Sequence, residues 1–113
     1  MSKFLYLFWN NEGLSKSISP ERMQELTKVW MSWMAELKQA GHVVQTGERL
    51  DCTGKMVRGK AKTVIDGPYA EAKDTIGGYL IIQATDLAQA VELAKGCPVL
   101  LGDGLVEVRP IIS

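Results

Sequence analysis

Charged and polar side chains gather in one short stretch of the chain, residues 66–74. Asp66 directly precedes a Gly-Pro pair. This combination favours a turn, because Asp accepts bonds from backbone amides, glycine tolerates unusual angles and proline fixes φ. Glu71 and Lys73 follow in the same loop, together with the hydroxyl group of Tyr69. An acid and a base beside a pocket can hold and polarise a small carbonyl or carboxylate compound, so we take this stretch as the candidate ligand site.

Arg109 is the expected cationic partner of that stretch. In the expected closing strand 105–112, two valines alternate with Glu107 and Arg109. If the valines face the helices, the charged pair faces the opposite surface of the sheet, where Arg109 joins Asp66 at the ligand site. A second interpretation stays open, in which Arg109 pairs with an acid of the loop only to hold the loop in place.

The chain lacks the ligands for a metal site. It contains two cysteines, Cys52 and Cys97, and one histidine, His42, all far apart in sequence. Because a zinc site needs about four ligands, these three residues cannot supply one within a protomer. We expect no metal and no cofactor, and we expect Cys97 to be a small buried hydrophobe.

Charge and hydropathy restrict the partners of the chain. The formal net charge is +0, which argues against nucleic acid and against an anionic membrane surface as main partners. Four basic residues cluster locally, and we interpret them as a solvated hairpin rather than an anion site: Lys55, Arg58, Lys60 and Lys62. With no signal peptide and no long apolar run, the expected compartment is the cytoplasm.

Periodicity and turn residues predict the elements. One helix begins after its N-cap Ser19 and stops at Gly41, and a second begins after Asp86 and ends at Gly96. A turn-bearing hairpin with its tip near Gly54 is expected at 51–59. Strands are expected at 3–9, 42–50, 60–65, 78–84 and 105–112.

This order predicts a single α+β domain over residues 1–113. It is the split βαβ pattern, an antiparallel sheet with two helices on one face. The strand at 3–9 and the segment Tyr79–Ile82 are apolar on both sides, so the uncovered sheet face must be apolar too. An exposed apolar face of this size is an association site, and we expect a homodimer that forms through it.

The run Asp-Gly-Pro-Tyr-Ala-Glu-Ala-Lys-Asp, followed by Gly-Gly-Tyr, resembles the motif of the DGPF-domain branch of the YCII-related family. Tyr69 stands where that branch usually has phenylalanine. The likeness runs from the first strand to the closing segment Val106–Pro110. It implies a ferredoxin-like fold that dimerises into an α+β barrel, and it carries over the loop residues Asp66, Gly67, Pro68, Glu71 and Lys73.

The resemblance does not settle an activity. In the wider YCII-related group a histidine and an aspartate are suggested as a catalytic pair. The helix position of that histidine falls near Trp30 in this chain, so the pair does not carry over and no catalytic residue is assigned.

Two functions remain in view. The first is binding or transformation of a small polar metabolite, without a metal, in a pocket between the sheet and the loop Asp66–Thr75. The second is a non-catalytic dimeric interaction or sensing module linked to transcriptional regulation, since relatives of this domain occur with alternative sigma factors. A ligand that raises the melting temperature of the purified protein would favour the first.

Overall fold

The computed structural model describes residues 1–11, 19–51, 53–67 and 74–113. None of the helices in this part of the chain combines the length and the hydropathy needed to span a bilayer. The elements follow in the order β1 (Ser2–Asn11), α2 (Pro20–Gln39), β2 (Val43–Arg49), β3 (Gly54–Arg58), β4 (Thr63–Gly67), β5 (Asp74–Ala84), α3 (Leu87–Ala94), the 3₁₀ helix η1 (Pro98–Leu101) and β6 (Leu105–Pro110).

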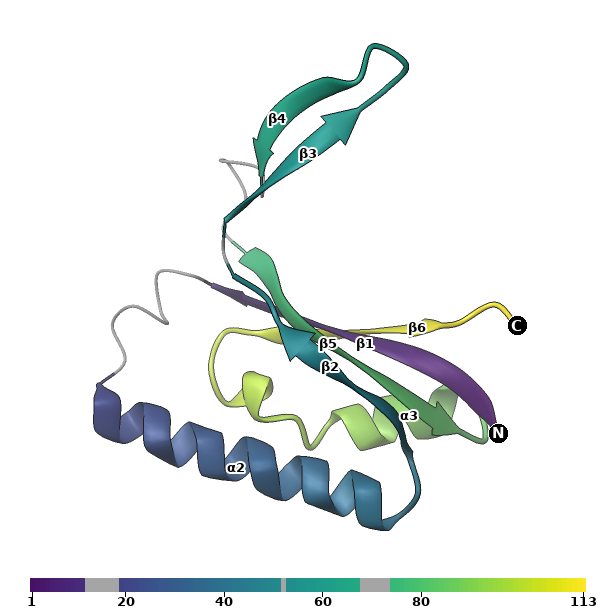
Figure 1. Cartoon of the computed structure of the whole chain (residues 1–113). Helices are drawn as coiled ribbons and strands as arrows, with labels where there is room; N and C mark the ends of the chain where they lie inside the picture. Colours follow the sequence, from purple (N-terminus) through teal and green to yellow (C-terminus); the bar gives the residue numbers. More distant parts are fainter. Residues whose placement is uncertain (12–18, 52, 68–73) are drawn as a thin grey trace.

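Four strands form the main sheet in the order β2-β5-β1-β6, and every neighbouring pair is antiparallel. Both helices lie against one face of this sheet (Figure 1). The architecture is α+β and consistent with a ferredoxin-like fold, as the order of elements predicts.

The core lies between the sheet and the two helices. Tyr6 on β1 is fully buried, and its hydroxyl group donates a hydrogen bond to the carbonyl oxygen of Ala90 on α3. Full burial of one large apolar side chain stabilises the fold by about 1.5–3 kcal/mol. On the central strands, every second residue points into this core. The buried apolar residues of the sheet and helices together are Phe4, Tyr6, Phe8, Trp33, Leu37, Leu80, Ile82, Ala84, Ala90, Ala94 and Cys97.

Helix α2 begins and ends where the sequence predicts. The hydroxyl oxygen of Ser19 accepts a hydrogen bond from the backbone N–H of Arg22 at 3.2 Å, and Pro20 occupies the first turn. Gly41, with φ of +79°, ends the helix in a conformation that favours glycine. Of its apolar stripe, Trp33 and Leu37 are buried, whereas Met23, Leu26 and Trp30 in the first half are only half-buried.

Strands β3 and β4 form a separate two-stranded sheet, which corrects two sequence predictions. The hairpin tip is the turn Gly59–Lys62 rather than Gly54, because Gly59 and Lys62 adopt the positive φ angles, +71° and +56°, that the turn requires. The strand expected at 60–65 is therefore the second arm of this hairpin and not part of the main sheet. Figure 1 shows the hairpin rising from the sheet on the side opposite the helices.

Candidate functional site

Two residues of the predicted ligand site, Asp66 and Arg109, lie in different sheets. The side chain of Asp66 on β4 is 88% exposed, and its carboxylate pairs with the ammonium group of Lys55 across the hairpin. The side chain of Arg109 on β6 is 66% exposed, and its Nε lies 3.9 Å from Oε2 of Glu107. Each is paired locally, and no ion pair joins Asp66 to Arg109 in the described part of the chain. The other predicted ligand residues lie outside the described residues: Tyr69, Glu71 and Lys73.

The sheet face opposite the helices carries a mixed apolar and charged surface. The valines of β6 pack against the core, so Glu107 and Arg109 share the other face, as alternation predicts. Beside them the side chain of Trp9 is half-buried, and its Nε1–H donates to Oε1 of Glu107 at 2.9 Å. Leu7 and Leu5 lie opposite Glu107 and Arg109 in the pairing of β1 with β6. No helix or strand of the described chain covers this face.

A cleft of about 620 Å³ separates the first half of α2 from the sheet. Its walls come from α2, β1, β2, β5 and the segment from η1 to the start of β6. The interior is largely apolar, with Phe8, Leu26, Trp30, Met34 and Leu80 among its lining residues. Phe8 and Trp30 meet edge to face, with ring centroids 5.0 Å apart, so the apolar wall has a defined shape.

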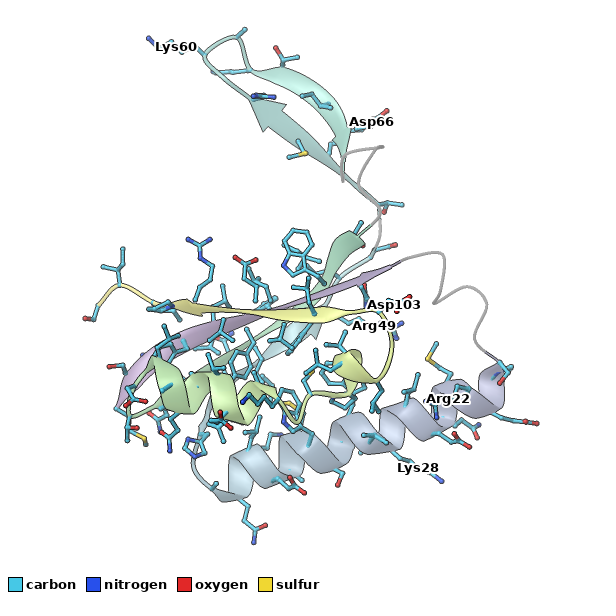
Figure 2. The ribbon with its side chains drawn as sticks, turned by 180° about the vertical axis from the view of Figure 1, so that it is seen from behind. Arg22, Lys28, Arg49, Lys60, Asp66 and Asp103 are labelled. Atoms are coloured by element: carbon cyan, nitrogen blue, oxygen red, sulfur yellow. The ribbon has the colours of Figure 1, made fainter. Side chains whose placement is uncertain are left out.

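Charged side chains line the same cleft. Arg22 contributes from the first turn of α2, Arg49 from the end of β2 and Asp103 from the turn after η1 (Figure 2). The guanidinium group of Arg22 is bonded to Glu25 at 3.0 Å. Arg49 and Asp103 are exposed and form no ion pair within the described residues.

Glycines bring the two strands at the cleft wall into close contact. A Cβ atom on Gly47 of β2 would lie 1.9 Å from the carbonyl oxygen of Tyr79 on β5. A Cβ atom on Gly78 of β5 would lie 3.2 Å from the carbonyl oxygen of Glu48. The pairing of β2 with β5 shifts register between Thr46 and Arg49, on either side of Gly47. Backbone rather than side chain therefore forms part of the cleft wall.

The buried thiol group and the buried phenol group are not reactive at neutral pH. Burial raises the pKa of the Cys97 thiol to about 12, against a smaller opposing effect of a backbone hydrogen bond at Val99. Burial is also the main cause that raises the pKa of Tyr6, and the nearby Cys97 adds to it. Cys97 is 2% exposed and serves as a small buried hydrophobe, as predicted.

Within the described ranges, no three side chains of the types His, Cys, Asp and Glu lie close enough together to hold a metal ion. The cleft offers groups that can recognise a ligand. Aromatic and aliphatic walls hold an apolar body, and arginine and carboxylate groups orient a polar end.

The sequence analysis missed this cleft. Trp33 is buried in the core, whereas Trp30 and Met34 pack against the core and also line the cleft. The usable signal was the coincidence of the apolar stripe of α2 with glycines at 47, 77 and 78 in the facing strands, since glycine leaves no side chain to fill the gap.

Comparison with known proteins places the chain in a family. A sequence comparison with curated proteins gives no match. The family model of the YCII-related domain matches residues 4–113, which is nearly the whole chain. The protein therefore belongs to the YCII-related family.

Proposed function

We propose that the protein binds a small amphipathic molecule, with an apolar or aromatic body and a carboxylate group, in the cleft between α2 and the sheet. The observation that carries this proposal is a cleft of about 620 Å³ whose apolar wall carries charged side chains at one end. Ligand sites typically measure about 300–1,000 Å³ and combine a mostly apolar lining with a few polar groups.

Arg49 is the residue assigned to the carboxylate. It has no ion-pair partner within the described residues, whereas Arg22 is already bonded to Glu25. A guanidinium group binds a carboxylate through two parallel hydrogen bonds, which fixes both the position and the direction of the ligand. Asp103 is placed to accept a hydrogen bond from a donor on the same ligand.

We also infer that the protein is a homodimer of the DGPF branch that closes its open sheet face. Support comes from the motif that begins at Asp66 and from the apolar residues of that face. Leu5, Leu7 and Trp9 are half-buried there, without a covering element in the described chain. A dimer that removes them from water gains about 25 cal/mol for each Å² of apolar surface buried. A ligand-binding dimer fits an enzyme and a sensing module equally well.

The sequence motif favours a second location for the ligand, between the sheet and the loop Asp66–Thr75. The presence of Arg109 and Glu107 on the open face supports it. Glu107 and Arg109 lie on the sheet face opposite the cleft, so substitutions there and in the cleft distinguish the two locations.

A thermal-shift screen tests the proposal. Aromatic and medium-chain aliphatic carboxylates are compared with their primary amides, which have the same shape without the charge. A carboxylate at a hundredfold its Kd stabilises the protein by about 2.7 kcal/mol, a rise of roughly 10 °C in Tm. Arg49→Gln is expected to weaken binding about 10- to 100-fold, because one charge-assisted pair is lost.

Thr46→Phe is the steric counterpart of that variant. Thr46 is an exposed strand residue that lines the cleft, so a phenyl group there fills the space and leaves every charge in place. It is expected to abolish the response to ligand. Arg109→Gln and Asp66→Asn are the controls and should respond like the unmodified protein. Loss of the response in these two controls alone would overturn the cleft assignment in favour of the loop.

A further inference from the structure

The hairpin of residues 54–67, which we call the hairpin arm, makes no extensive contact with another helix or strand of the described chain. Val57 and Val64 lie opposite each other on one side of it, and they are 69% and 61% exposed. Only Met56 and Ile65, on the other side, are half-buried. An isolated two-stranded hairpin is marginally stable in water, so this arm requires further contacts to hold its conformation.

The overall dimensions of the chain also reflect the extended hairpin arm. The chain measures 45 × 41 × 19 Å and its radius of gyration is 15.6 Å. A closely packed domain of about 100 residues has a radius of gyration of about 13 Å. Because the sheet and helices form one packed body, the excess is consistent with the arm that extends from it.

The arm rises from the main sheet on the side opposite the helices. Figures 1 and 2, which view the molecule from opposite sides, both show the helices on one side of the main sheet and the arm on the other. This is the side on which Leu5, Leu7 and Trp9 are uncovered. A second molecule docked on that face would lie directly beside the arm.

Charge separates the arm from the rest of the chain. Residues 54–67 contain four cationic side chains and one carboxylate, a formal charge of +3. The whole chain is neutral, so the remaining residues carry −3. If two copies exchanged arms, each cationic arm would lie against the anionic body of the other copy. This attraction favours a two-fold dimer of identical chains.

We propose that the hairpin arm is a dimerisation arm, which packs Val57 and Val64 against the body of a second copy of this chain. The partner copy sits on the open sheet face, and each arm clasps the flank of the other molecule. This inference rests on the homodimer of the proposed function. It goes beyond it by assigning a second contact surface to residues that the main sheet does not use.

Sedimentation equilibrium on matched variants tests the arm. The double variant Val57→Thr and Val64→Thr keeps β-branched side chains, and with them the strand propensity, while it removes apolar surface. It is expected to raise the dimer Kd at least tenfold. Val44→Thr on β2, a strand residue that is 40% exposed, is the control and should leave Kd unchanged. Circular dichroism checks that all variants fold.

The outcomes separate the arm from the dimer itself. If the protein is dimeric and its Kd is the same with and without the arm substitutions, the arm does not contribute to dimerisation. The sheet-face dimer is then unaffected. A protein that is monomeric at micromolar concentration overturns both. Leu7→Asp, which places a charge on the open face, should give monomer or aggregate whatever the role of the arm.

Isotope mixing supplies an independent readout. Dimers formed from ¹⁴N- and ¹⁵N-labelled protein are treated with a carbodiimide, which joins lysines to carboxylates at zero length. Cross-links from Lys60 at the arm tip to body carboxylates should appear as mixed-isotope peptides. Arm cross-links that are exclusively of one isotope would show that the arm contacts its own chain, and the proposal would fail.

Discussion

The contact between α2 and the sheet is closed at one end and open at the other, although a single helix forms both. In the second half of α2, Trp33 and Leu37 are buried in the core, and the indole N–H of Trp33 donates to the carbonyl oxygen of Leu93 at 3.2 Å. In the first half, Met23, Leu26 and Trp30 line the cleft. The same apolar stripe therefore serves packing at one end and recognition at the other.

The difference originates in what faces the helix. At the closed end, Trp33 stacks on Tyr6 with ring centroids 6.2 Å apart, and α3 supplies a further wall. At the open end, the facing strands present Gly47, Gly77 and Gly78, which have no side chains to meet the helix. Helical periodicity indicates which side of a helix is apolar. Whether that side is packed depends on the side chains that the facing elements present to it.

The largest effect is expected at the closed end. Trp33→Ala should lower the free energy of unfolding by about 3–5 kcal/mol, because it removes a buried aromatic side chain and leaves a cavity. Trp30→Ala at the open end should cost clearly less, since its side chain is only half-buried. Urea unfolding measures both. Equal losses would show that the two ends are packed alike.

Alkaline pH provides a second test of the closed end. Cys97 has a folded-state pKa of about 12 against an ordinary value of 9.0, so the buried thiol stays protonated while the unfolded chain ionises. The buried Cys97 thiol makes its full contribution to the free energy of unfolding below pH 9. That contribution falls by about 1.4 kcal/mol per pH unit as the pH rises from 9 towards 12. Cys97→Ala should show a shallower loss of stability over pH 9–10, and identical slopes would contradict the burial of the thiol.

A smaller effect is expected from one buried hydroxyl group. Tyr6→Phe deletes the donor to the carbonyl oxygen of Ala90 and should cost about 1 kcal/mol. Tyr79→Phe is the matched change at a half-buried tyrosine. It should leave the free energy of unfolding within about 0.5 kcal/mol of that of the unmodified protein. The urea midpoints of the two variants, compared at equal m-values, measure both losses of stability. A larger loss for Tyr79→Phe than for Tyr6→Phe would contradict this prediction.

The smallest effect on stability is expected at the cleft. Arg49→Gln should change the free energy of unfolding by no more than about 0.5 kcal/mol, since its side chain is exposed and has no ion pair in the described chain. A loss above 1 kcal/mol without ligand would show that Arg49 serves the fold and not a ligand.

The sequence predicts the main sheet and its helices well, because local signals and burial agree there. Alternation groups Phe4, Tyr6 and Phe8 on one side of β1, and the structure shows that this side faces the core; Ser19 and Gly41 mark the ends of the long helix. The predicted position of the hairpin tip was wrong, since a positive φ at Lys62 has no sequence signal comparable to that of glycine. The cleft was missed because the apolar stripe of α2 and the glycines at 47, 77 and 78 lie far apart in sequence, and only the fold brings them face to face.

The three tryptophans give the most direct test of the ligand proposal, because each reports a different region. Trp30 lines the cleft, Trp33 lies in the core and Trp9 lies on the open sheet face. Their indole N–H signals are followed by ¹⁵N NMR during titration with a carboxylate from the screen, and are assigned by Trp9→Phe and Trp30→Phe. We predict a saturable shift of the Trp30 signal, with the Trp9 signal unchanged. A shift of Trp9 with Trp30 unchanged would contradict the cleft and place the ligand on the open face.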